Sequence, residues 1–268
     1  MRQSVLRDNR RYPLIMAHRG DPTCAIENTL SSISSAVQLG VDVVEIDIRM
    51  TRDGKLVLFH DETLERLTGI GKPVEAMVLD EIQQIRLGSE SEPDEQREEN
   101  QMFLHRIPSL DQVFQHFPRT KFNMDIKSEN PKAPEILADI ISQYNKEQEV
   151  IVASFHAKQI SYFREMCPEI VTAAHPNEVY RFLFGSKLRL LSLLARNTEY
   201  DALQVPPKQG PITVVDKRFL AEAHKRDIEV HVWTINEESE MERLTMLGVD
   251  GIFTDYPEKM FNVLNQLG

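Results

Sequence analysis

Short apolar runs rich in β-branched residues recur eight times along the chain, and segments with helical spacing of apolar residues separate them. Alternation of strand and helix predicts a parallel sheet with right-handed crossovers, and eight such units close into a barrel. We therefore expect an α/β fold, a (β/α)8 TIM barrel with its ligand site at the carboxyl ends of the strands. The runs are LIMAH (14–18), VVEIDI (43–48), FNMDIK (122–127), VIVAS (150–154), VTAA (171–174), ALQV (202–205), EVHVWT (229–234) and GIFT (251–254).

A ninth strand-like run, KLVLFH (55–60), follows the second strand with only a short link that contains TRDG. Parallel neighbours need a crossover of roughly a dozen residues or more, so this run cannot be a barrel strand. Because Asp53-Gly54 is a hairpin signal, we expect an antiparallel return that carries His60 back over the barrel mouth. The acidic, aperiodic stretch GSESEPDEQREENQ predicts an exposed insertion, over about 52–108, before the barrel resumes at the helix of IPSLDQVF.

Length and charge narrow the classes of function. A chain of 268 residues is ordinary for one barrel, so we expect a single domain over 1–268. The net charge of −11 argues against a nucleic-acid partner, although a local cationic pocket for one small anion remains possible. Two cysteines are too few for a disulfide framework, and neither a secretory signal nor a transmembrane run is apparent. We therefore expect a cytoplasmic protein.

Two carboxylates share one face of the second strand. Side chains alternate across a strand, so Glu45 and Asp47 point to the side opposite the apolar residues of VVEIDI. Since the apolar side must meet the helices, both acids point into the barrel. A buried pair of negative charges is costly unless a cation or a proton neutralises it.

The third strand repeats this pattern, because Asn123, Asp125 and Lys127 share the inward face of FNMDIK. Three inward carboxylates without thiolates suit Mg²⁺ or Ca²⁺ better than Zn²⁺ or copper. A structural network with Arg or Lys is the alternative, and it would be the better interpretation of a single buried acid. Two strands with the same pattern favour the metal.

Two histidines and two cations complete the predicted site. His18 and Arg19 end the first strand, and His60 ends the hairpin return above the same mouth. A lone histidine is more often structural, but two beside a predicted metal suggest proton transfer, as hydrolysis of a phosphodiester requires. Arg19 and Lys127 can hold phosphate oxygens or balance the acids, and these two roles are compatible.

The order of motifs HRG, ENT (27–29), EIDIRMTRDG, LVLFHD, DIK, SF (154–155), VHVWTIN and GVDGIFTDYP closely resembles the glycerophosphodiester phosphodiesterase family, from residue 14 to about 262. The resemblance implies the same barrel with a segment inserted after the second strand. It implies an acid/base pair of His18 and His60, metal ligands Glu45, Asp47 and Asp125, and phosphate contacts Arg19 and Lys127. The family pattern also supports Glu27 and Phe155 as pocket residues. Trp233 could stack on a glycerol, or it could simply fill the core.

Two positions depart from the family pattern. The third metal ligand is usually glutamate, and the shorter Asp125 would draw the metal toward the third strand, bind it through water or change its identity. Asp227 stands where the family often has glycine, and we expect this to affect only a helix cap.

The leading functional hypothesis is metal-dependent hydrolysis of a small-molecule glycerophosphodiester to glycerol 3-phosphate and an alcohol. The alternatives are a lysophospholipase D or sphingomyelinase-D-like activity on lipids, and a non-catalytic protein that binds a phosphodiester. Residues 179–196 bear on the choice, because they carry four cations, no acids and many Leu and Phe. We expect an outer barrel helix there, and weak, salt-sensitive contact with an anionic membrane is the alternative interpretation.

Overall fold

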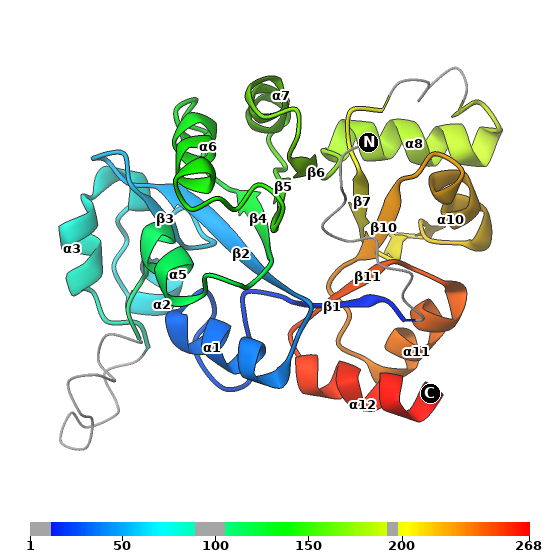
Figure 1. Ribbon diagram of the computed structural model, residues 1–268, viewed down its shortest axis with the longest axis horizontal. Helices are drawn as coiled ribbons and strands as arrows, with labels where there is room; N and C mark the ends of the chain where they lie inside the picture. The colour runs from blue at the N-terminus through cyan, green and yellow to red at the C-terminus, as the bar shows by residue number, and fades with distance from the viewer. Residues whose placement is uncertain (1–11, 89–104, 192–197) are drawn as a thin grey trace.

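A ring of eight parallel strands forms the centre of the protein, and the helices surround it (Figure 1). The computed structural model describes residues 12–88, 105–191 and 198–268. A parallel bridge between Ala173 and Ala202 joins the two end strands, so the barrel is nearly closed and the predicted fold is confirmed. In spatial order the strands are β6 (Val171–Thr172), β5 (Val150–Ala153), β4 (Phe122–Ile126), β2 (Val43–Met50), β1 (Leu14–Ala17), β11 (Gly251–Thr254), β10 (Glu229–Val232) and β7 (Ala202–Val205).

The two faces of each strand meet different surroundings, as the alternation predicts. On β2, Val44, Ile46 and Ile48 are buried in a cluster with the outer helices. Val43 instead belongs to a cluster inside the barrel, which also contains Phe253 of β11. The inward face of β2 therefore continues from this apolar interior to polar positions nearer the carboxyl end.

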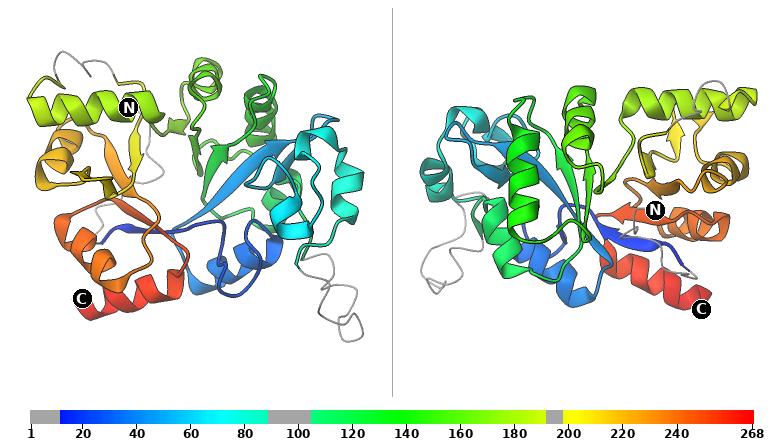
Figure 2. Two further views of the ribbon diagram at one scale, coloured as in Figure 1. Left: turned by 180° about the vertical axis from the view of Figure 1, so that it is seen from behind. Right: turned by 45° about the horizontal axis from the view of Figure 1, so that its top comes forward.

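Eight helices of seven or more residues, among the described segments, cover the outside of the barrel (Figure 2). Side-chain caps mark three of their starts: Thr29, Ser109 and Asp216 each accept a hydrogen bond from a backbone N–H in the first turn. The helices are α1 (Leu30–Leu39), α5 (Leu110–His116), α6 (Ala133–Gln143), α7 (Ala157–Met166), α8 (Pro176–Leu188), α10 (Lys217–His224), α11 (Glu238–Leu247) and α12 (Pro257–Leu267).

The segment after β2 returns as a hairpin. Strand β3 (Leu56–Leu58) pairs antiparallel with β2, with Leu58 opposite Ile48, so the predicted return is confirmed. The chain continues through α2 (Glu65–Thr68), η1 (Val74–Ala76) and α3 (Leu79–Gln84).

The described part of this excursion buries more apolar side chains than its acidic composition predicts. Its described part has an apolar cluster of its own, which includes Phe59, Leu64, Val74 and Ile82. The sequence predicts an exposed insertion. This prediction is wrong for the described flanks of the insertion, because a buried apolar cluster stabilises them. The acidic stretch that suggested exposure lies outside the described residues from position 89 onward.

Three further features complete the fold. A small hairpin, β8 (Lys208–Gln209) with β9 (Ile212–Thr213), is not predicted, because its exposed two-residue strands show no alternation. Asp227, after α10, has a left-handed φ of 58°, which explains why a glycine suits this helix end. The outer helix expected over 179–196 corresponds to α8, which begins earlier, at Pro176, and ends at Leu188, while residues 192–196 lie outside the described part. In the described segments no helix is long and apolar enough to cross a membrane.

Candidate active site

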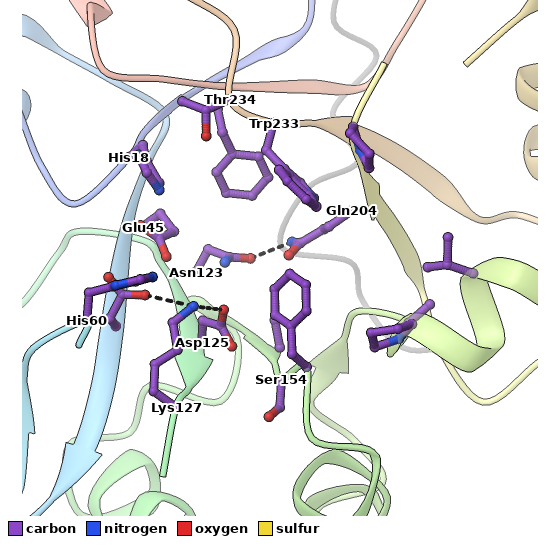
Figure 3. Close-up of a pocket in the computed structure, with 18 of the residues that line it drawn as sticks. His18, Glu45, His60, Asn123, Asp125, Lys127, Ser154, Gln204, Trp233 and Thr234 are labelled. Atoms are coloured by element: carbon purple, nitrogen blue, oxygen red, sulfur yellow. Dashed lines mark hydrogen bonds and ion pairs between the residues drawn. The ribbon is translucent and has the colours of Figure 1, made fainter. Parts of the chain in front are cut away.

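A cavity of about 520 Å³ opens at the carboxyl ends of the strands (Figure 3). The structure brings nine of the ten predicted site residues to this cavity. They are His18, Arg19, Glu45, Asp47, His60, Asp125, Lys127, Phe155 and Trp233. Three of them directly follow a strand: His18 follows β1, Lys127 follows β4 and Trp233 follows β10. The sequence predicts that each lies within its strand, but these strands end one or two residues earlier.

The three carboxylates come from two adjacent strands. Glu45 and Asp47 lie on the inward face of β2, and Asp47 is directly opposite Asp125 of β4 in the parallel register. All three are buried, at 5%, 1% and 7% exposure. Lys127, just beyond β4, places Nζ 2.7 Å from Asp125 Oδ2 and 3.2 Å from Asp47 Oδ1.

Burial and neighbouring charges separate the pKa values of these acids. Burial and the charge of Asp47 raise the pKa of Glu45 to about 8. Burial would also raise the pKa of Asp47, but Lys127 and Arg19 outweigh it and lower that pKa. Burial raises the pKa of Asp125 despite its pairing with Lys127. When all three acids are ionised, their three negative charges exceed the two positive charges of Lys127 and Arg19.

His18 follows β1 and is held by an aspartate. Its Nδ1 lies 2.7 Å from Asp255 Oδ1, and Asp255 Oδ2 accepts a 2.7 Å hydrogen bond from Asn236 Nδ2. Burial would lower the pKa of His18, but the hydrogen bond with Asp255 and the charge of Glu45 outweigh it and raise that pKa. His18 is thus oriented from one side while it faces the cavity from the other.

His60 has a matching arrangement, although a different part of the chain supplies it. Its Nδ1 lies 2.7 Å from Oδ1 of the adjacent Asp61, whose other oxygen accepts a hydrogen bond from Arg66. Each histidine therefore uses Nδ1 for an aspartate, which leaves Nε2 for the cavity. Figure 3 shows His18 and His60 on the same side of the cavity as Glu45 and Lys127.

Arg19 is fixed through its backbone as well as its side chain. It has a left-handed φ of 61°, and its N–H donates to Glu45 Oε2 at 2.9 Å. Its guanidinium pairs with Asp47 at 3.1 Å and with Glu27 at 2.9 Å. Asn28 also holds Asp47, through hydrogen bonds of 2.8 Å and 3.1 Å.

Glu27 is the one predicted site residue that does not line the main cavity. It lies in a neighbouring cavity of about 400 Å³, which His18, Arg19 and Asp255 also line. Its carboxylate pairs with both Arg19 and Arg66. It therefore links the loop after β1 to the excursion that carries His60.

The oxygen donors of Glu45, Asp47 and Asp125 suit a hard cation in their chemistry. In their present positions, however, the described residues contain no group of three acids or histidines arranged to hold a metal ion. Asp125 Oδ1 is buried and has no hydrogen-bond partner among the described residues. A buried oxygen without a partner is costly and can accept a cation. A cation that bound there would compete with Lys127 for Asp47 and Asp125.

The side of the cavity opposite the histidines is largely apolar and aromatic. Phe155 and Trp233 make an edge-to-face contact with ring centroids 6.1 Å apart, and Phe155 is 56% exposed. Figure 3 places Trp233 and Gln204 across the cavity from His60. Gln204 donates a 2.6 Å hydrogen bond to Asn123, so an amide pair lies between the acids and the apolar side.

Sequence reasoning missed the two aspartates that hold the histidines. The signal for Asp61 is its position directly after His60, and the signal for Asp255 is its position after the last strand, where barrel sites lie. Gln204 gave a weaker signal, as an inward polar residue on an apolar strand. His231, expected to be structural, is fully buried and contacts Glu229 at 3.0 Å.

Comparison with known proteins identifies a family and relatives of this chain. The model of the Glycerophosphoryl diester phosphodiesterase family matches residues 18–259. A Glycerophosphodiester phosphodiesterase from Caldanaerobacter subterraneus subsp. tengcongensis is 31% identical over 261 residues, which cover 95% of this chain and 99% of the relative. A Lysophospholipase D from Homo sapiens is 25% identical over 269 residues, which cover 93% and 85%.

Solved structures share the same fold. A phosphodiesterase from Oleispira antarctica, in complex with the product sn-glycerol-3-phosphate, aligns with a TM-score of 0.76 and 24% identity over 95% of this chain and 97% of that one. At this identity the likeness supports the barrel fold alone. By the family match and the 31% identical relative, this chain belongs to the glycerophosphoryl diester phosphodiesterase family and is a phosphoric diester hydrolase.

Proposed function

We propose that this chain hydrolyses glycerophosphodiesters, such as glycerophosphocholine, to glycerol 3-phosphate and an alcohol. The observation that carries the proposal is the pair of histidines, His18 and His60, each bound through Nδ1 to an aspartate and both at one cavity above three buried carboxylates. Such a pair can supply the two proton transfers that the reaction needs. The Caldanaerobacter relative bears the name of this activity.

His18 is the proton donor in this proposal. Although burial would lower its pKa, the hydrogen bond with Asp255 and the charge of Glu45 outweigh burial and raise that pKa, which favours the imidazolium, and Nε2–H can protonate the oxygen of the departing alcohol. His60, with Nδ1 held by Asp61, accepts the proton of the attacking hydroxyl at Nε2. The two aspartates fix the ring orientations and stabilise the imidazolium that each step needs or forms.

Arg19 and Lys127 bind the phosphate oxygens. Both face the cavity, and both now pair with Asp47. A phosphate that entered would offer each cation an alternative anion, with charge-assisted hydrogen bonds. Lys127 also lies 5.3 Å from the ring centroid of Phe155, so its position is restrained from the apolar side.

Glu45, Asp47 and Asp125 would hold a divalent metal, Mg²⁺ or Ca²⁺. The buried oxygen of Asp125 that has no hydrogen-bond partner among the described residues supports this. The pKa of Glu45, which burial and the charge of Asp47 raise, supports it too, because a bound cation would favour the ionised form. When bound, such an ion supplies electrostatic stabilisation of the charge that develops on the phosphate. Release of Lys127 from the two aspartates would then free it for the substrate.

The apolar side of the cavity favours a second candidate substrate, a lysophospholipid cleaved at the same phosphodiester. Val179, Leu183 and Phe253 line the cavity together with Phe155 and Trp233. A glycerol alone needs little of this apolar surface, whereas an acyl chain would bury it. The human relative is named a Lysophospholipase D.

A coupled assay for glycerol 3-phosphate, over a panel of glycerophosphodiesters, tests the proposal. We expect turnover that a chelator abolishes and added Mg²⁺ or Ca²⁺ restores. Release of choline from lysophosphatidylcholine tests the second substrate in parallel. Full activity after exhaustive removal of metal would contradict the metal role. Binding of the diesters without any turnover would favour a non-catalytic phosphodiester-binding protein instead.

A further inference from the structure

Helix α8 carries a line of apolar side chains on its outer face. Tyr180, Phe184 and Leu188 follow one another at intervals of four residues and are 47%, 51% and 62% exposed. Residues four apart lie on the same face of a helix, so the three form a stripe. Leu190, two residues beyond the end of the helix, is also exposed, at 43%. Phe182 of the same helix is fully buried against the barrel. Packing on the barrel alone therefore does not account for the stripe.

Two cations lie beside this stripe. Arg181 and Arg189 are exposed, and neither has an acidic partner among the described residues. The other charged residues of this helix have partners of opposite charge, because Lys187 pairs with Asp216 and Glu178 pairs with Arg164. At physiological ionic strength charges act over about 8 Å, so these local cations count for more at this face than the net charge of −11.

The stripe begins at the cavity. Tyr180 lines the cavity and is also half-exposed, and Val179 and Leu183 of the same helix line the cavity's apolar side. From Tyr180 the stripe follows α8 along the periphery of the barrel, where the helix lies in all three ribbon views (Figures 1 and 2). One apolar surface thus leads from the site to the outside of the molecule.

We propose that this surface docks on an anionic lipid bilayer. The aromatic and leucine side chains would enter the boundary between headgroups and acyl chains, and the two arginines would bind lipid phosphates. The inference goes beyond the hydrolysis of water-soluble diesters and does not depend on it, because docking is measured without turnover. We call the docking residues the α8 surface: Tyr180, Arg181, Phe184, Leu188, Arg189 and Leu190.

Vesicle flotation tests the docking directly. In about 0.1 M salt we expect the protein to float with vesicles of phosphatidylglycerol in phosphatidylcholine, to bind pure phosphatidylcholine more weakly, and to be released as the salt is raised. Phe184→Asp and Leu188→Asp are each expected to weaken binding about tenfold or more. Arg181→Gln and Arg189→Gln are each expected to weaken it about fivefold.

Met246→Asp is the matched control. Met246 is 73% exposed on α11, which α10 separates from α8 in Figure 1, so the same charge change is placed on a different face. Thermal unfolding of each variant checks that its fold is retained. Three outcomes would overturn the proposal. The wild-type protein could stay in the unbound fraction, or Met246→Asp could lose as much binding as the stripe variants. In the third outcome, the stripe variants float as the wild type does and only dissociate a dimer.

Discussion

His18 and Asp255 are 237 positions apart in the chain, yet Nδ1 of the histidine lies 2.7 Å from Oδ1 of the aspartate. Barrel closure brings them together, since β1 and β11 are parallel neighbours with Ala17 opposite Thr254. The side-chain amide of Asn236 fixes Asp255 in turn, because Nδ2 donates to Asp255 Oδ2 and Oδ1 accepts from the backbone N–H of Asp255. The orientation of His18 is therefore set from the last strand of the barrel.

The variant Asp255→Asn removes the charge that helps to raise the pKa of His18. A proton donor loses activity as the pH rises through its pKa, so a lower pKa moves the alkaline limb of the kcat/KM profile to lower pH. We expect this shift together with a fall in kcat of about tenfold or more. Asp61→Asn serves as the comparison, because it acts on His60. An alkaline limb that stays in place would remove Asp255 from the control of His18.

Substrates with different leaving groups separate the roles of the two histidines. His18→Ala and His60→Ala are each expected to lower kcat about 10²-fold or more with a choline leaving group. With p-nitrophenolate, which leaves without a proton, we expect His18→Ala to lose much less and His60→Ala to lose as much as before. Measurements of kcat on both substrates give, for each variant, the ratio of its two losses in kcat. The reverse pattern would exchange the two roles.

Metal removal should make the stability of the protein depend on pH through Glu45. Its pKa of about 8 exceeds the ordinary 4.5, so between these values the folded state keeps a proton that the unfolded state has lost. Stability therefore falls as the pH rises through this window. In chelator we expect a steeper fall of Tm from about pH 5 to about pH 8 in the wild type than in Glu45→Gln. Equal slopes would show that Glu45 does not carry the effect.

Asp125 allows a test of the proposed third metal ligand. Asp125→Glu adds one methylene and should change the preference between Mg²⁺ and Ca²⁺ more than it lowers the maximal rate. Asp125→Ala should weaken metal activation strongly, because it removes a buried oxygen donor. Titration of activity against each ion makes the comparison. A silent Asp125→Ala would mean that Asp125 is not a ligand.

Gly20 and Gly40 separate backbone strain from steric contact. Their φ values are similar, 87° and 85°, but a Cβ at Gly20 would lie 2.6 Å from the backbone carbon of Ser32, whereas no described atom lies within 4 Å at Gly40. Gly40→Ala should cost about 1–2 kcal/mol of unfolding free energy. Gly20→Ala should cost more and should also lower kcat/KM, since it disturbs the loop of Arg19. Urea unfolding measures both, and equal losses would show that Ser32 gives way freely.

Local periodicity carries enough information to predict the barrel and the direction of its inward side chains. A strand has a period of two, so the sequence VVEIDI by itself turns Glu45 and Asp47 away from the helices. The same reasoning places Asp125 beside them, and the short link before 55–60 excludes a ninth parallel strand. These predictions depend on neighbours within a few positions, which is where sequence patterns are informative.

The partners of those side chains depend on the tertiary structure. Periodicity states where a side chain points, but not which distant segment meets it there. Only the folded barrel pairs His18 with Asp255 and places Glu27 beside Arg66, 39 positions away. It also turns Glu27 away from the main cavity and leaves Tyr180 at the cavity's edge with an exposed stripe behind it. These contacts arise when separate strand ends converge at one mouth, and no local pattern records that convergence.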